Sequence, residues 1–242
     1  MNKFRLLSSS ILFLILTLPF FVQEAQSQSV GIGVKVGPAV TSHLHDFRFV
    51  SGDIDLSLTP NPTSGIETGL MFRQWLGESL RLQIEPSLIT MGASYEEGFQ
   101  LRGFNFQTVS ETDLLYIQVP ILFQLTTTPP ERIVYGRPYS STTYHLTGGV
   151  FGGYLMSAQF SGSNTGAPIG IEFSGDFSND VKNQYSDFDA GLIIGAGLEH
   201  GYNNRIGFET RLMLSVLDAG SADAISFKPH NMGAVFSFYL ML

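Results

Sequence analysis

The residues best placed to act together are charged side chains that fall on one face of an alternating hydrophobic pattern. Alternate side chains of a β-strand share a face, so these four basic and five acidic groups would converge on one enclosed surface. They are Lys35, Glu67, Arg73, Arg81, Glu85, Asp189, Glu199, Glu209 and Arg211. Such charges can line a gated ion path, or they can pair as a salt-bridge plug. Buried charges are tolerated only when paired and hydrogen-bonded, which favours the plug.

Histidines offer two other kinds of chemistry. His43 and His45, followed by Asp46, have the i, i+2 spacing of a metal site. No third ligand is near in sequence, so a surface loop with unpaired histidines is favoured and no metal or other cofactor is predicted. His145 and His200 lie near predicted strand ends, with His200 pointing outward at a short turn. Neither has a serine and an acid in strand period, so the sequence predicts no catalytic residue.

The elements that would position these residues are β-strands with two unlike faces. In the first strand, Val34 and Val36 alternate with Lys35 and Gly37. The same period of two recurs along the chain, which predicts eight strands. They cover residues 30–40, 65–75, 80–95, 112–126, 144–160, 187–199, 205–216 and 232–242. An even strand number is typical of single-chain bacterial outer-membrane barrels.

The less apolar face of the strands distinguishes a soluble barrel from a membrane barrel. Glycines share it with the charges, and only 14% of the residues are charged, too few to cover a soluble exterior. We therefore predict an all-β, antiparallel, up-and-down transmembrane β-barrel of eight strands with its charges inside. Four apolar residues near mid-strand should face lipid: Val34, Ile194, Leu214 and Phe236.

Connections should alternate in length along such a barrel. Residues 43–63, 96–111, 161–184 and 218–228 are predicted as long loops, and 76–79 and 201–204 as short turns; the connection 127–143 is unexpectedly long. The turn near Asn203 predicts that Gly197 lies opposite Glu209 and Gly195 opposite Arg211, because missing side chains make room for long ones. Pro86 and Pro120 should interrupt the hydrogen-bond ladder locally without a full bulge.

The N-terminus has the pattern of an export signal. Lys3 and Arg5 precede an apolar run over residues 6–22, and Ala25 and Ser27 supply small residues for cleavage. We predict a signal peptide at 1–27 and a mature barrel at 28–242, exported through the general secretory route. The absence of cysteine excludes a lipoprotein anchor. A net charge of −8 makes nucleic acid an unfavourable partner.

Several of these strands resemble a known family. LQIEPSLITMG at 82–92, YIQVPILFQ at 116–124, TGGVFGGY at 147–154 and DAGLIIGAGLE at 189–199 are similar, in order, to the PorT-type outer-membrane β-barrel domain of Bacteroidetes. The resemblance implies a barrel of about this size in the outer membrane of a Gram-negative bacterium and, for one branch, a part in type IX secretion. Residues 231–242, from Asn231 to Leu242, resemble the last-strand signal that barrel-assembly machinery reads.

The function expected from these features is structural. The sequence predicts an integral outer-membrane β-barrel, in contact with membrane lipid, that lacks catalytic activity and presents long extracellular loops for partner docking around a charged, plugged lumen. Three alternatives stay open: a component associated with type IX secretion, a narrow ion or solute pore, and a lipid-modifying barrel enzyme.

Overall fold

A computed structural model defines the fold between Val30 and Leu242. It describes residues 30–44, 47–51, 54–101, 104–127, 133–134, 137–138, 140–166, 173–201, 204–220 and 230–242. Residues 31–242 form one compact unit. The predicted signal peptide at 1–27 and its cleavage site lie outside the described residues. Among those residues, no helix is long and apolar enough to cross a membrane.

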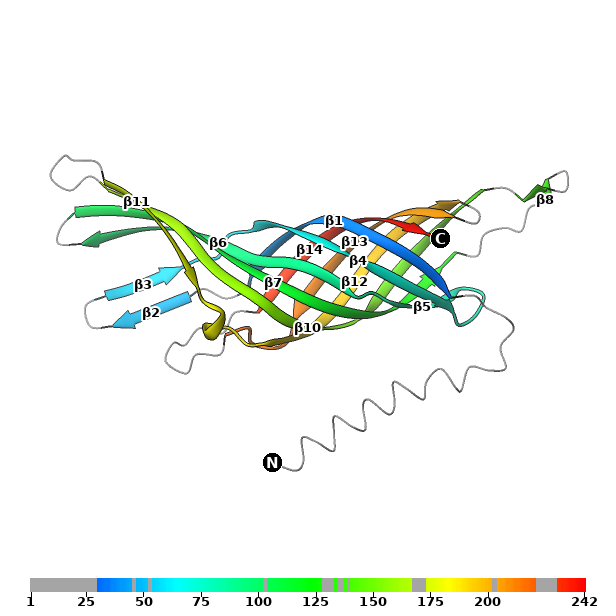
Figure 1. Ribbon diagram of the computed structural model, residues 1–242, viewed down its shortest axis with the longest axis horizontal. Coiled ribbons are helices and arrows are strands. Elements are labelled where there is room, and N and C mark those ends of the chain that lie inside the picture. The colour runs from blue at the N-terminus through cyan, green and yellow to red at the C-terminus, as the bar shows by residue number, and fades with distance from the viewer. Residues whose placement is uncertain are drawn as a thin grey trace, which may run out of the picture. The chain divides into compact units, whose positions relative to one another are not determined.

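Ten antiparallel strands form the main sheet (Figure 1). They are β1 (Gly31–His43), β4 (Thr63–Trp75), β5 (Leu80–Ile84), β6 (Ser87–Leu101), β7 (Phe104–Thr126), β10 (Ser141–Gly166), β11 (Phe173–Asp180), β12 (Phe188–Gly201), β13 (Arg205–Ser215) and β14 (Asn231–Met241). β7 and β10 each lie next to an end strand of the sheet, and the pairing between them closes the ring of hydrogen-bonded strands. Side chains therefore face either an enclosed interior or the outside.

The strands follow the alternation in the sequence. In β1 the apolar Val34 and Val36 are half-exposed on the outside, whereas Lys35 and Gly37 are buried. Branched residues pack well along a pleated strand, and glycine and charged residues occupy the interior. The predicted outward residues Ile194 and Leu214 are also exposed, and Phe236 is partly buried.

The sheet has ten strands rather than the predicted eight, and prolines explain one of the two extra strands. β5 and β6 both pair with β4 and β7 in one continuous register, so they occupy a single position in the ring. The interruption contains Pro86 and faces Pro120. The amide of Glu85 donates to the Pro120 carbonyl at 3.0 Å, but Pro120 has no N–H with which to donate back. The predicted local break is confirmed.

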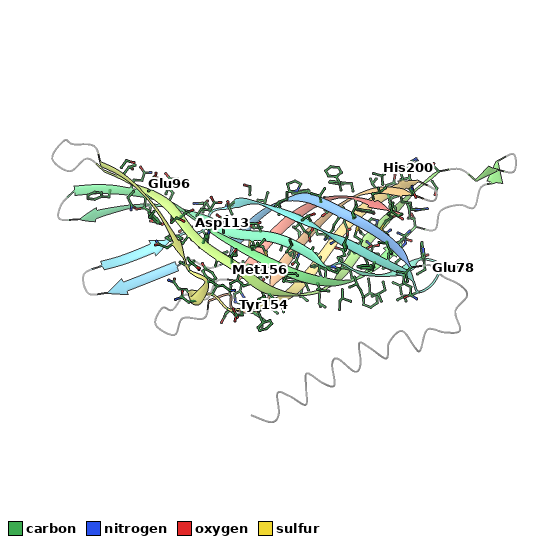
Figure 2. The ribbon with its side chains drawn as sticks, in the orientation of Figure 1. Glu78, Glu96, Asp113, Tyr154, Met156 and His200 are labelled. Carbon is green, nitrogen blue, oxygen red and sulfur yellow. The ribbon has the colours of Figure 1, made fainter. Side chains whose placement is uncertain are left out.

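The second extra strand extends the sheet beyond the ring. β10 pairs with β12 as far as Tyr154, and from Gln159 onward it pairs with β11 instead. Its register against β7 shifts between Leu155 and Ser157, and Met156 at this irregularity is exposed (Figure 2). A bulge increases the local bend and twist of a strand. Here it marks the point where β7 and β10 leave the ring.

Three of the four predicted long loops, 43–63, 96–111 and 161–184, contain strands, and most of the fourth, 218–228, lies outside the described residues. The interval 96–111 contains a hairpin in which β6 and β7 pair up to Leu101 and Phe104, and 161–184 contains the end of β10, β11 and a short 3-10 helix, Lys182–Gln184. The interval 43–63 holds a ribbon of β2 (Phe47–Ser51) and β3 (Ile54–Leu58), and 127–143 a ribbon of β8 (Ile133–Val134) and β9 (Arg137–Pro138). In the interval 105–113, polar residues dominate both faces, so the period of two that reveals a half-apolar strand is missing there.

The interior has two layers. Charged and amide side chains fill the half near the turn 76–79, while an apolar cluster fills the half near the β6–β7 hairpin. Leu114, Tyr116, Leu155, Ile193 and Met213 belong to this cluster, and each is at most 3% exposed. We call the end with residues 76–79 and the Gly201–Arg205 pair the short-turn end, and the end with the β6–β7 hairpin the hairpin end.

Candidate functional site

All nine charged residues singled out in the sequence are buried in the interior, none more than 6% exposed. Eight of them take part in ion pairs that connect β1, β4, β5, β12 and β13, and Asp189 lies apart from these. Strands far apart in sequence thus contribute to the same polar layer. Burial of this kind removes hydration from each charge, so its partners decide whether it is tolerated.

Glu85 is the centre of the first group of charges. Its Oε2 accepts from Lys35 Nζ at 2.5 Å and from Arg211 Nη1, and its Oε1 accepts from Arg211 Nη2 at 2.6 Å. Arg211 Nη2 also donates to Glu209 Oε2 at 2.7 Å. The fork of the guanidinium matches the two oxygens of a carboxylate, so Glu85, which directly follows β5, is held against β13 across the interior.

Glu67 completes this group. Its Oε1 accepts from Lys35 Nζ at 2.7 Å and from the Gln118 side chain at 3.1 Å, and its Oε2 accepts from Ser237 Oγ at 3.3 Å. Neutral donors therefore satisfy the lone pairs that lysine leaves. Gln118 and Ser237 carry no charge and were not predicted from the sequence, although both have inward parity on their strands.

Glu199 is the centre of a second group, nearer the short-turn end. Its oxygens lie 2.6 Å from Arg73 Nη1, 2.7 Å from Arg81 Nη1 and 2.8 Å from Arg205 Nη1. Arg73 Nε donates to Gln83 Oε1 at 2.6 Å, and Gln83 Nε2 donates to Glu85. The two groups are thus joined through one neutral amide. Arg205 was missed because it is the first residue of its strand, although its odd number matches the inward parity of β13.

Room for the long side chains comes from glycines on the neighbouring strand. Gly197 lies opposite Glu209 and Gly195 opposite Arg211, so the predicted register is confirmed. A Cβ on Gly195 would lie 2.9 Å from Arg211 Cγ, and one on Gly197 would lie 2.6 Å from His145 Nε2. A side chain at Gly195 would compete with Arg211 for the same space, and one at Gly197 would compete with His145.

Asp189 lies apart from both groups. It accepts from Ser215 Oγ at 2.7 Å and from the Asn231 side chain at 3.0 Å, and Asn231 also donates to the Tyr116 hydroxyl at 3.2 Å. Neutral donors hold this carboxyl next to the apolar cluster. Asp189 forms no ion pair with any residue that the structure describes.

The histidines are distributed differently from the surface loop that the sequence favoured. His43 is at the end of β1, buried, with Nδ1 2.7 Å from the Tyr95 hydroxyl. Its neighbour Leu44 ends the described stretch, and His45 and Asp46 lie outside it. His145 is buried, with Nε2 3.7 Å from Glu209 Oε2. His200 is exposed and bonds Thr142 at 2.9 Å. In the described part of the chain, no three His, Asp or Glu residues are grouped as a metal site would need.

At the hairpin end, β6, β7, β10 and β11 continue as a sheet beyond the ring (Figure 1). Acidic side chains are frequent on it, and Figure 2 shows Glu96 and Asp113 at this end, with Glu78 and His200 at the other. The exposed or half-exposed acidic residues of the extension are Glu96, Glu97, Glu111, Asp113, Asp176 and Asp180. None of the described side chains of these strand extensions is Lys or Arg, and Lys182 follows β11 in the short 3-10 helix. The outer edge of β11 has no strand partner in the described part of the chain.

Comparison with known proteins identifies the family of this chain. The sequence model described as outer membrane protein beta-barrel domain matches residues 24–219. No curated protein sequence matches. Among solved structures, Ail, the attachment invasion locus protein of Yersinia pestis, is 13% identical with a TM-score of 0.30, over 88% of this chain and 99% of that one. Neisserial surface protein A is 9% identical with a TM-score of 0.31, over 86% and 95%.

Proposed function

Because the chain belongs to the family of outer membrane protein beta-barrel domains, we propose that it is a non-catalytic docking protein of the Gram-negative outer membrane. On this proposal the eight positions of the strand ring cross the membrane, the interior is closed, and the sheet at the hairpin end receives a partner outside the cell. The observation that carries the proposal is the extension of β6, β7, β10 and β11 beyond the ring.

The extension offers a specific mode of binding. An edge strand presents a row of N–H and C=O groups that an extended segment can pair with. β11 has such an edge, and Asp176 and Asp180 on it are exposed. An extended protein segment with basic side chains would match both the hydrogen-bonding edge and its charge. Charge complementarity of this kind contributes mainly to specificity and to the rate of association.

The interior supports a structural role rather than transport. A ring of eight strands leaves room for little more than side chains. Here the paired charges around Glu85 fill one layer, and buried apolar residues such as Leu114 and Ile193 fill the next. A path for ions would have to cross both layers. The closed interior therefore speaks against the pore alternative.

Orientation follows from the asymmetry of the two ends. Outer-membrane barrels have short periplasmic turns and longer extracellular segments, which would place residues 76–79 in the periplasm and β11 outside. The chain contains no cysteine, so single-cysteine variants give an unambiguous test. A membrane-impermeant maleimide added to intact cells should label Asn179→Cys on β11 and leave Glu78→Cys unlabelled. Labelling of Glu78→Cys alone would reverse the orientation and contradict the proposal.

Docking is tested by cross-linking on native outer membranes. A photo-activated cross-linker on Asn179→Cys should join the chain to one protein in a stoichiometric complex. Reversing the edge charge with Asp176→Lys and Asp180→Lys should abolish the complex, while Glu78→Lys at the short-turn end should leave it intact. A complex that survives the edge variant, or no cross-linked protein at all, would refute docking at β11.

The same experiment addresses the secretion alternative. The matched family is broader than the PorT-type branch, so the resemblance to that branch and a role in type IX secretion stay predictions. A cross-linked partner from the secretion apparatus would assign the chain to that role. Modified lipid A that depends on the chain would instead support the enzyme alternative.

A further inference from the structure

The group around Glu199 has more positive charge than it can neutralise. Arg73, Arg81 and Arg205 all pair with this one carboxylate, and we call these three residues the arginine cluster. Among the described residues, they form no ion pair with a second carboxylate. Three guanidinium groups against one carboxylate leave a surplus of two positive charges, and arginine stays protonated in proteins.

Glu199 cannot accept the remaining N–H groups of these arginines. Its Oε1 lies 2.7 Å from Arg81 Nη1 and 2.8 Å from Arg205 Nη1. Its Oε2 accepts from Arg73 at 2.6 Å and from the Tyr239 hydroxyl at 3.2 Å. Oε1 thus lies between two guanidinium groups, and Oε2 accepts from two donors. The remaining donor groups of the arginines need acceptors from elsewhere.

Arg81 shows this need most clearly. It is 1% exposed, and its Nε has no hydrogen-bond partner among the described residues. Its guanidinium stacks on the Trp75 ring, with Cζ 4.0 Å from the ring centroid. Stacking occupies a face of the guanidinium and leaves its in-plane N–H groups directed at the edge, the geometry with which arginine binds planar or tetrahedral oxyanions. A buried donor without an acceptor is costly.

The neighbouring charges do not remove the surplus. Around Glu85, two basic residues, Lys35 and Arg211, face three acids, Glu67, Glu85 and Glu209. That group lacks one positive charge, and the neutral Gln83 separates it from the arginine cluster. The two groups combined keep a net charge of +1, with the excess at the short-turn end.

The cluster is also open to solvent at that end. The Arg205 side chain is 19% exposed, and its Nη1 donates to Thr143 Oγ1 at 2.9 Å. Arg205 begins β13, and it pairs with Gly201 at the end of β12. An anion could therefore reach the buried guanidinium groups from the short-turn end without crossing the interior.

We propose that the arginine cluster binds a phosphate group, which enters from the short-turn end and accepts the in-plane donors that Glu199 leaves unused. A phosphate dianion carries the two negative charges that the cluster lacks, and its oxygens suit bidentate guanidinium donors. Free phosphate and the phosphomonoester headgroup of phosphatidic acid present this same chemistry. The proposal does not depend on docking at the hairpin end.

Binding is measured on the full chain, purified in a maltoside detergent that contains no phosphate. Two probes separate the sources: inorganic phosphate, and dihexanoyl phosphatidic acid below its micelle concentration. Phosphorus NMR and titration calorimetry should show one saturable site per chain. Binding of inorganic phosphate assigns free phosphate as the source. Binding of phosphatidic acid alone assigns the headgroup.

Two variants and one control decide whether the cluster is responsible. Arg81→Gln and Arg205→Gln should each weaken binding at least tenfold. Without phosphate, Arg81→Gln should keep or raise the urea midpoint of unfolding, because a like charge is removed; a merely structural arginine would lower it. Lys182→Gln at the opposite end should bind as the wild type does. No saturable binding to either probe, wild-type affinity in Arg81→Gln, or an equal loss in Lys182→Gln would overturn the proposal.

Discussion

Gly195 lies directly opposite Arg211 in the β12–β13 pair, so close that a Cβ on the glycine would meet the arginine Cγ at 2.9 Å and the Thr210 carbonyl oxygen at 2.7 Å. The absent side chain is what admits a buried arginine. The pairing shows how strand register and the polar interior depend on each other, since a slip by one residue would place every side chain on the opposite face.

Gly195→Leu should therefore destabilise the barrel. The added side chain would have to displace Arg211 or the backbone, and overpacking a tight interior costs about 1–3 kcal/mol. The matched control is Gly148→Leu, because a Cβ at Gly148 meets no atom within 4 Å. Urea unfolding in lipid vesicles measures both. Equal stabilities for the two variants would show that the interior can yield at Gly195.

Arg211→Leu should be more destabilising, because it leaves the carboxylates of Glu85 and Glu209 without the positive charge of Arg211. Removing one partner of a buried ion pair costs about 3–5 kcal/mol. Adding Glu209→Gln to Arg211→Leu should recover part of that loss, since it removes one of the stranded charges. A water-filled interior would solvate both carboxylates, so an unchanged free energy of unfolding in Arg211→Leu would speak for a pore.

The same variant separates plug from pore by conductance. Planar-bilayer recording on the wild-type chain should show no steady current, because the ion pairs and the apolar cluster close the interior. Arg211→Leu should show none either, as the apolar cluster around Leu114 and Ile193 remains. A steady current whose ion selectivity shifts in Arg211→Leu would contradict the closed interior.

Charge on the outer face should be costly only where lipid covers it. Val34 and Leu214 are 48% and 42% exposed on the outside of the ring. Val34→Arg and Leu214→Arg should each lose about 2–4 kcal/mol of folding stability, the cost of arginine near the bilayer midplane. Thr165→Arg, exposed on the extension of β10, should change stability by no more than about 0.5 kcal/mol. Tolerance at Val34 and Leu214 would mean that this face does not contact lipid.

Removal of the predicted signal peptide should shorten the chain. Ala25 and Ser27 have the small side chains that a signal peptidase requires after an apolar run, so we expect the mature protein to begin at Gln28. Intact-mass measurement on protein extracted from outer membranes tests this cleavage. A mass that retains residues 1–27 would refute it.

The alternating pattern in the sequence was sufficient to predict the strands of the ring and which of their side chains face inward. A period of two reports directly which side chains share a face, because the pleat alternates them without help from other segments. The register of β12 against β13 could also be predicted, since a short turn ties two neighbours and the glycines match the long charges. The prolines predicted where the ladder breaks, because a missing N–H is a property of the residue itself.

Only the tertiary structure decided which charges meet. Arg73 and Glu199 are 126 residues apart, on strands β4 and β12 that do not pair, and no local period relates them. The tilt of the strands and the closure of the ring determine that these two side chains meet in space. The same holds for the surplus at the arginine cluster and for the extension of β6, β7, β10 and β11. In residues 105–113 of the extension polar residues dominate both faces, so alternation cannot reveal this stretch of strand, which pairs with its neighbours through the backbone.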